Sequence, residues 1–244
     1  MDLFSLRGRT ALVTGARGGI GRAIALGLAE AGAKLVLLGR TADFGEVPDA
    51  VVATVVVDLA DPSALEPALA PVLAAHRIDV LVNNAGTIHR EPAAEVSLTD
   101  WRRILSVNLD SVFELSRLVG GRMLDGRGGK IVNIASLLSF QGGLTVPAYA
   151  ASKHAVAGLT KALANEWAPH NVQVNAIAPG YIATDNTADL RADPDREPSI
   201  RGRIPAGRWG TPSDLVGAAV FLSSPASDYV NGHVLVVDGG WLGR

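Results

Sequence analysis

The chain has 244 residues, with 22 Lys and Arg against 24 Asp and Glu, which gives a formal net charge of −2 at pH 7. This near balance excludes the positive surface of a general nucleic-acid binder or of a polybasic membrane binder. The sequence contains no cysteine, so disulfides, zinc–thiolate sites and iron–sulfur clusters are excluded too. Residues 1–9 include Asp2, Arg7 and Arg9 and lack the apolar centre of a signal peptide, and we therefore expect a cytoplasmic protein.

Short apolar runs rich in β-branched residues alternate with helical patterns along the whole chain. The predicted strands are 10–14, 33–38, 54–57, 78–82, 130–134, 172–178 and 233–237, and the predicted helices are 19–31, 62–75, 99–120, 149–167 and 212–222. Strands that are apolar on both faces and are separated by helices indicate a parallel sheet with right-handed crossovers. We predict an α/β fold in which residues 1–244 form a single domain, one doubly wound parallel sheet (a Rossmann fold) with helices on both faces.

Two connections depart from this alternation. Residues 39–53 show no helical period, so we expect the second crossover helix to be short or absent. Residues 186–205 are charged, contain Pro194, Pro198 and Pro205, and follow the end of a predicted strand. Such a segment is either a mobile lid over a site at the carboxyl ends of the strands or a solvated surface loop.

Glycines cluster directly after the first predicted strand, between Thr14 and Gly21. Glycine permits a tight turn and a close approach of the backbone to a pyrophosphate, and the following helix presents free N–H groups and a favourable dipole to phosphates. The flanking strand and helix favour a dinucleotide-binding turn over a purely structural one. The candidate cofactor-binding residues here are Gly15, Arg17, Gly18, Gly19, Ile20 and Gly21.

Tyr149 and Lys153 stand four residues apart on a predicted helix and therefore share one face. A phenol ionises near pKa ~10, which is too high for a base at neutral pH, but a nearby ammonium favours the phenolate. An exposed Tyr–Lys contact is the structural alternative. Ser136 and the segment 83–86 follow the ends of other strands, where open α/β sheets bind ligands, and this context favours a catalytic site.

In order and spacing, the glycine segment, Asp58, the segment 83–86, Ser136 and Tyr149-x-x-x-Lys153 resemble the short-chain dehydrogenase/reductase family over nearly the whole chain. The resemblance implies that Tyr149 exchanges a proton with the substrate oxygen and that Ser136 hydrogen-bonds the same oxygen. It implies that Lys153 lowers the pKa of Tyr149 and binds the nicotinamide ribose, and that Asn108 holds a water molecule in a proton relay. We therefore expect an NAD(P)-dependent oxidoreductase that transfers a hydride between the cofactor and a secondary alcohol or ketone.

The same resemblance implies further cofactor contacts: Asp58 and Leu59 with adenine, Asn84 with the adenosine ribose, and Ile182 and Thr184 with the nicotinamide carboxamide. The remaining predicted cofactor residues belong to the neighbouring strand-end segments and are Ala85, Gly86, Pro179 and Gly180.

The choice between NAD and NADP stays open at this stage. No acid follows the second strand at Gly39, and Arg40 could meet a 2′-phosphate, which favours NADP. Gly18 stands where NADP-using members of the family often have a basic residue, Arg17 is one residue earlier, and Asp43 could replace the missing acid.

Residues 134–143, 178–184, 203–210 and 224–233 resemble those of 2-deoxy-D-gluconate 3-dehydrogenases, also named 2-dehydro-3-deoxy-D-gluconate 5-dehydrogenases. A sugar acid needs a local cation, since arginine binds a carboxylate through two parallel bonds. Arg90 is the first candidate and Arg208 the second, with His89 and Gln141 for hydroxyl groups. The five histidines show no ligand spacing with carboxylates, so we expect no metal.

Three other interpretations remain beside the sugar-acid one: a 3-oxoacyl-carrier-protein reductase, a gluconate 5-dehydrogenase, and a cofactor-sensing regulator without turnover.

The predicted helices 99–120 and 149–167 carry small apolar residues, among them Ala151, Ala155 and Ala162, and similar proteins pair these helices into tetramers. We therefore expect a homotetramer with a small-molecule substrate and with neither nucleic acid nor membrane as a partner.

Overall fold

A computed structural model describes residues 2–46 and 48–244. In these residues one parallel sheet contains β1 (Thr10–Thr14), β2 (Lys34–Gly39), β3 (Val51–Val56), β4 (Val80–Asn83), β5 (Gly129–Ile134), β6 (Val172–Pro179) and β7 (Val234–Val237). The strand order is β3-β2-β1-β4-β5-β6-β7. The direction of chain progress reverses between β1 and β4, where ligands of open α/β sheets bind. The predicted fold class is confirmed.

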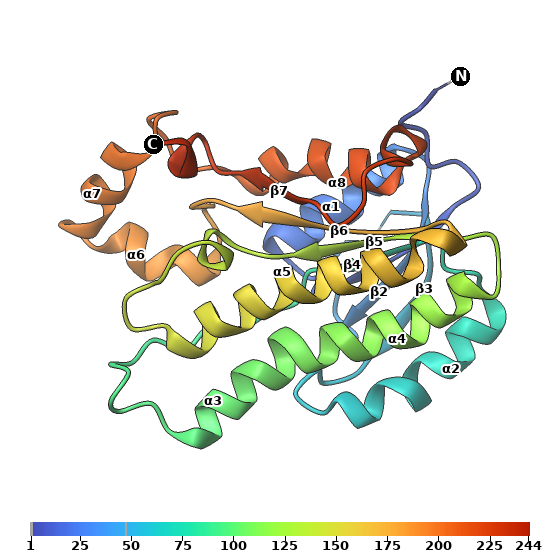
Figure 1. Ribbon diagram of the computed structural model, residues 1–244, viewed down its shortest axis with the longest axis horizontal. Helices are drawn as coiled ribbons and strands as arrows, with labels where there is room; N and C mark the ends of the chain where they lie inside the picture. The colour runs from blue at the N-terminus through green and yellow to red at the C-terminus, as the bar shows by residue number, and fades with distance from the viewer. Residues whose placement is uncertain (1, 47) are drawn as a thin grey trace.

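Helices cover both faces of the sheet (Figure 1). Helices α1 (Gly19–Glu30) and α8 (Val216–Ser223) lie on one face, and α2 (Leu65–Ala75), α4 (Ser111–Leu124) and α5 (Pro147–Trp167) lie on the other. One hydrophobic cluster fills each interface between helices and sheet. All eight residues of β6 are buried, the polar Gln173 and Asn175 included, as expected for a central strand with helices on both faces of the sheet.

The predicted helix 99–120 is interrupted. Helix α3 (Leu98–Leu105) passes into a π-helical turn, Ser106–Asp110, before α4 begins, and α4 ends at Leu124, beyond the predicted limit. One extra residue in a helical turn hardly changes the spacing of the apolar residues along the chain. The sequence therefore predicted a single helix over residues 99–120. Such π-helical turns are frequent at functional sites, and this one carries Asn108.

The segment after β6 is more regular than its charge and prolines indicated. It contains α6 (Ala188–Ala192) and α7 (Arg196–Arg203), which lie beyond the carboxyl ends of the strands (Figure 1). Both helices are short, and α7 buries only Ile200, so their apolar period is too weak to be detected in the sequence.

Between β2 and β3 the described residues form no helix, as expected, and residue 47 lies outside the description. Arg22 of α1 fixes this connection by donating hydrogen bonds to the carbonyl oxygens of Phe44 (2.8 Å) and Glu46 (2.7 Å). The Phe44 ring is buried beside Gly39. Strand β3 stands first in the strand order and so forms one edge of the sheet. Its residue Val56 is 51% exposed.

Within the described part of the chain, no helix combines the length and the apolar character needed to cross a membrane.

Candidate active site

Thr14 connects β1 to β4 at the reversal point of the sheet. Its buried hydroxyl accepts hydrogen bonds from the backbone N–H groups of Asn84 (3.0 Å) and Ala85 (2.9 Å). The side-chain amide of Asn84 in turn donates to the Thr14 carbonyl oxygen at 2.9 Å. The glycine turn and the segment after β4 are therefore held together as one unit.

The start of α1 fits the pyrophosphate of a dinucleotide. Gly18 precedes the helix without a side-chain cap, and no acidic residue stands in the first turn, so the N–H groups there remain available to an anion. A Cβ atom on Gly21 would overlap the Gly15 carbonyl oxygen and the Asn84 amide, and Gly15 itself has φ +66°. Gly19 and Ile20 are the first residues of α1. These residues would hold the phosphates of NAD(P).

At the adenosine end, charged residues lie in an arrangement that the sequence does not reveal. Arg17 and Asp43 form an exposed ion pair at 3.3 Å, so the Asp43 carboxylate already has a cationic partner. Arg40 is exposed. Asp58 accepts a hydrogen bond from the Ala60 N–H at 3.0 Å, and the Leu59 side chain is buried in the core, which leaves only its backbone for a ligand.

Tyr149 and Lys153 lie on one face of α5, with the Lys153 Nζ 5.6 Å from the centre of the tyrosine ring. The Lys153 side chain is buried, and its ammonium donates to the Ile134 carbonyl oxygen at 2.6 Å. Burial lowers the pKa of Lys153 to about 8. Gly86 lies beside this ammonium, since a Cβ atom on it would lie 3.8 Å from the Lys153 Nζ, an ordinary contact distance.

The titration of Tyr149 differs from the expectation. Burial raises the pKa of Tyr149, a hydrogen bond with the Ser136 side chain lowers it in part, and so does the positive charge of Arg90. The lysine that was expected to depress the phenol pKa instead binds a backbone carbonyl oxygen. The phenol is therefore protonated at neutral pH in the free protein, with Ser136 and Arg90 as its nearby partners.

The Asn108 side chain is held by hydrogen bonds to two neighbouring segments. Its side-chain Oδ1 accepts from the Thr87 N–H at 2.8 Å, while Nδ2 donates to the Thr87 carbonyl oxygen (2.9 Å) and to Ser152 (3.2 Å). Both amide protons are thereby used within the protein, and the water molecule of the proton relay stays a prediction. Asn108 fixes the segment after β4 against α5.

The predicted substrate residues divide into two groups. Arg90 is exposed, acts electrostatically on Tyr149, and donates to the Asn186 carbonyl oxygen at 2.8 Å, so it connects the surroundings of Tyr149 to the segment after β6. Arg208, in contrast, holds Asp214 with two hydrogen bonds of 2.8 and 2.9 Å. The second candidate for a carboxylate ligand thus already has a carboxylate partner within the chain.

His89 and Gln141 also have partners that the sequence did not indicate. His89 Nε2 lies 3.1 Å from the Glu91 carboxylate, and Asp100 joins this group with its ligand atoms within 4.8 Å. The structure thus groups one histidine with two carboxylates, which the spacing of the histidines in the sequence did not indicate, and the expectation of no metal stays a prediction. The Gln141 Oε1 accepts a hydrogen bond from the Trp241 indole at 3.4 Å, which leaves its amide N–H groups for other partners.

The remaining cofactor candidates form the far wall of the same edge. Pro179 ends β6, and Gly180 allows β6 to approach β7, because a Cβ atom there would collide with Asp238. Ile182 is buried and bridges Gly210, and Thr184 lies against Gly19. The structure therefore brings residues from β4, β5, α5 and β6 around the start of α1.

Comparisons with known proteins agree with this geometry. A family profile described as enoyl-(acyl carrier protein) reductase matches residues 15–242. The chain is 54% identical to a 2-dehydro-3-deoxy-D-gluconate 5-dehydrogenase of Bacillus subtilis, over 100% of this chain and 98% of that protein. The Escherichia coli protein of the same name is 50% identical, over 100% and 99% respectively.

The chain belongs to the short-chain dehydrogenase/reductase family. Among solved structures, a gluconate 5-dehydrogenase from Burkholderia cenocepacia in complex with NADP and tartrate superimposes with a TM-score of 0.95, at 40% identity over 100% of this chain and 98% of that one. NAD(P)-dependent oxidoreductase chemistry, predicted from the motifs, is therefore confirmed at the level of the family.

One set of residues in this family member escaped the sequence analysis. Tyr181, Trp209 and Trp241 form an aromatic cluster with ring centroids 4.7 to 5.4 Å apart, and the cluster packs against Leu137 and the α7 residue Ile200. Leu137 follows Ser136, so the cluster connects α7 to the serine. Only the four tryptophans in a chain poor in aromatics could have given a signal for it.

Proposed function

We propose that the chain is a sugar-acid dehydrogenase that interconverts a secondary alcohol and a ketone on a substrate of the 2-dehydro-3-deoxy-D-gluconate or 2-deoxy-D-gluconate type. The observation that carries the proposal is the grouping of a proton-carrying phenol, Tyr149, with the Ser136 hydroxyl and the Arg90 guanidinium. In this proposal Tyr149 moves a proton, Ser136 positions the substrate oxygen, and Arg90 binds a carboxylate. The names of the most similar relatives support the same substrate class.

When bound, the nicotinamide cofactor supplies or accepts the hydride at the carbinol carbon. Ser136 would orient the substrate oxygen towards Tyr149, and the protonated phenol would donate its proton to that oxygen in the direction of ketone reduction. Lys153 would bind the nicotinamide ribose, and Asn108 would keep Thr87 and the neighbouring backbone in place.

Arg90 would recognise the acid group of the substrate. An arginine has five N–H donors, so the contact with the Asn186 carbonyl oxygen leaves donors for two parallel bonds to a carboxylate. Binding of substrate would then strengthen the connection between Arg90 and the segment 186–205, which we propose to act as a lid. Limited proteolysis with and without cofactor and substrate tests the lid, since equal cleavage rates would contradict it.

Initial rates with 2-dehydro-3-deoxy-D-gluconate, 2-deoxy-D-gluconate and gluconate test the proposal. Tyr149→Phe should lower kcat by about 10²–10⁴-fold, because the proton carrier is lost. Arg90→Ala should raise KM for these acids by about 10- to 100-fold, as expected for a lost charge-assisted bond. The control is Arg102→Ala, an exposed arginine on α3. An Arg90 variant with unchanged KM would exclude this role.

We propose NADP as the preferred cofactor. Arg40 and Arg17 are both exposed beside the expected adenosine end, Gly39 rather than an acid ends β2, and Asp43 is paired with Arg17. The Burkholderia relative was crystallised with NADP. Arg40→Ala should lower kcat/KM for NADP by about tenfold or more and leave that for NAD unchanged. A wild-type enzyme that uses NAD better would refute the preference.

Gluconate 5-dehydrogenase is the second candidate, favoured by the Burkholderia structure. The substrate panel separates the two candidates, because only gluconate 5-dehydrogenase activity needs a substrate with a hydroxyl group at the second carbon. Acetoacetyl thioester substrates test the 3-oxoacyl-carrier-protein reductase alternative. Cofactor reduction that Tyr149→Phe abolishes would exclude a regulator without turnover.

We further propose a homotetramer formed through α4 and α5, a single folded domain over residues 1–244, and a cytoplasmic location. Phe113 on α4 is 47% exposed, and Ala151 and Ala155 leave part of α5 free for close approach of another helix. Light scattering that gives a monomer would contradict the assembly, and two separate unfolding transitions would contradict the single domain.

A further inference from the structure

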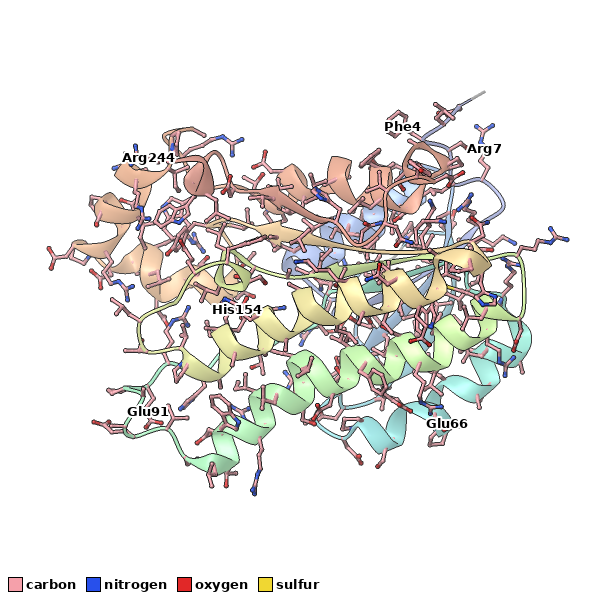
Figure 2. The ribbon with its side chains drawn as sticks, viewed as in Figure 1. Phe4, Arg7, Glu66, Glu91, His154 and Arg244 are labelled. Atoms are coloured by element: carbon pink, nitrogen blue, oxygen red, sulfur yellow. The ribbon has the colours of Figure 1, made fainter. Side chains whose placement is uncertain are left out.

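A hollow of about 450 Å³ lies at the amino-terminal edge of the sheet, opposite the candidate active site. In Figure 2, Arg7, which precedes β1, and Glu91, which follows β4, mark these two ends of the molecule. The hollow is formed where β1, β2, β4 and β5 begin. Its volume falls within the range of about 300–1,000 Å³ that holds small ligands. Nothing in the proposed dehydrogenase reaction uses it.

Cations dominate the walls of this hollow. Five Lys and Arg residues and two Asp residues line it, in a protein that carries a net negative charge overall. The basic residues are Arg9, Lys34, Arg77, Arg127 and Lys130, and the acidic ones are Asp79 and Asp228.

Both carboxylates already have partners. Asp79 accepts hydrogen bonds from the Arg77 guanidinium at 2.6 Å and from the Thr10 N–H at 3.0 Å. Asp228 pairs at 2.7 Å with Lys130, whose side chain is only 3% exposed. The acidic groups of the hollow are thus neutralised by two of its five cations.

In the described part of the chain, three of the five cations that line the hollow are not paired with its carboxylates. Among the residues that the structure describes, Arg9, Lys34 and Arg127 form no ion pair and no side-chain hydrogen bond. Burial is the main reason that the pKa of Lys130 is lowered, Asp228 opposes this, and the charge of Arg9 adds to the lowering, so Arg9 lies near Lys130.

A helix end accounts for part of this charge, because α2 ends at Ala75, which lines the hollow, and the carbonyl groups at a helix end favour cations. Arg9 and Lys34, however, stand at the start of strands, and Lys130 lies within one. Several like charges around one concave space repel each other unless an anion lies between them. Arginine supplies two parallel N–H donors that match both phosphate and carboxylate oxygens.

We propose that this hollow binds a small polyanion with two or more phosphate or carboxylate groups, at a site separate from the catalytic edge. Lys34 and Arg127 contact the anion from opposite walls, β2 on one side and the turn before β5 on the other, and Arg9 completes the site between them. Lys130, which is buried and paired with the exposed Asp228, lies at the inner side of the site.

Isothermal titration calorimetry with pyrophosphate and with citrate, at constant ionic strength, tests the site. Saturating NADP is present throughout, so that the glycine turn at α1 is filled and does not compete for pyrophosphate. The test variant is Lys34→Ala/Arg127→Ala, in which both replaced side chains are exposed. The matched control, Arg102→Ala/Lys161→Ala, removes two exposed cations from α3 and α5.

We expect the wild type and the control to bind one anion per chain, and the test variant to bind it at least about tenfold more weakly with unchanged kcat and KM. Preference for pyrophosphate would identify the occupant as a phosphorylated compound, and preference for citrate as a polycarboxylate; either supports the site. If the wild type binds neither probe, or the test variant binds as tightly as the wild type, the proposal is wrong.

Discussion

Burial of the Lys153 ammonium lowers the stability of the folded protein. The proposed catalytic role of this lysine requires that burial. The pKa of this lysine falls from 10.5 to about 8 because of burial. That difference corresponds to about 3 kcal/mol between the charged and neutral forms. Below pH 8 both folded and unfolded chains carry the proton, and the folded state bears the full cost. Between pH 8 and 10.5 the unfolded state binds more protons than the folded state, so this contribution to stability rises with pH.

Lys153→Met keeps the length of the side chain and removes the charge. At pH 7 the variant should be more stable than the wild type by up to about 3 kcal/mol, reduced by about 1 kcal/mol for the lost hydrogen bond to the Ile134 carbonyl. This advantage should disappear as the pH approaches 10.5, while dehydrogenase activity is lost at every pH.

Urea unfolding of the free protein, followed by circular dichroism from pH 6.5 to 10.5, measures both free energies. Taking the difference between wild type and variant cancels other groups that titrate in this range. Lys161→Met, which replaces an exposed lysine on the same helix, is the control and should stay within about 0.5 kcal/mol of the wild type. A wild-type-minus-Lys153→Met difference that does not change with pH would refute the reasoning.

Three further substitutions test the framework of the site. Thr14→Val should lower the free energy of unfolding by about 1–3 kcal/mol for each backbone N–H left unpaired, as measured by urea unfolding. Gly21→Ala should weaken NADP binding by the equivalent of about 1–3 kcal/mol in calorimetry, because the new methyl group overlaps backbone; equal affinity would contradict the proposed turn. Trp241→Ala should destabilise the protein by about 3 kcal/mol and raise KM for the sugar acid, while the Kd for NADP stays constant.

The sheet was predictable because its strands are buried on both faces and its helices have a clear apolar period. The parallel arrangement followed from the alternation of strands and helices, whereas the strand order β3-β2-β1-β4-β5-β6-β7 was not predicted from the sequence. The π-helical turn at Asn108 was missed, since one additional residue in a turn leaves the apolar pattern almost unchanged. Helices α6 and α7 were missed because they bury a single apolar side chain between them.

At the site, the sequence predicted which residues gather but not what they contact. The spacing of Tyr149 and Lys153 fixes a shared helix face, whereas the choice of the Ile134 carbonyl as a partner depends on how α5 packs on β5. The pairing of Arg208 with Asp214 was within reach, because the two are six residues apart. The aromatic cluster joins residues from distant segments, and no local pattern encodes it.

The uncovered edge strand β3 has a consequence for how the protein fails. Residues 51–57 read Val-Val-Ala-Thr-Val-Val-Val, without a charge, a proline or a glycine, and six of the seven are β-branched residues of high β-propensity. In the native sheet the open side of this strand is free to pair with another chain. When heat loosens the neighbouring connection, which Arg22 holds by two hydrogen bonds, identical segments from different molecules can align and pair. Thermal inactivation should therefore be irreversible and depend on protein concentration, and its onset should be set by this edge rather than by the catalytic side of the molecule.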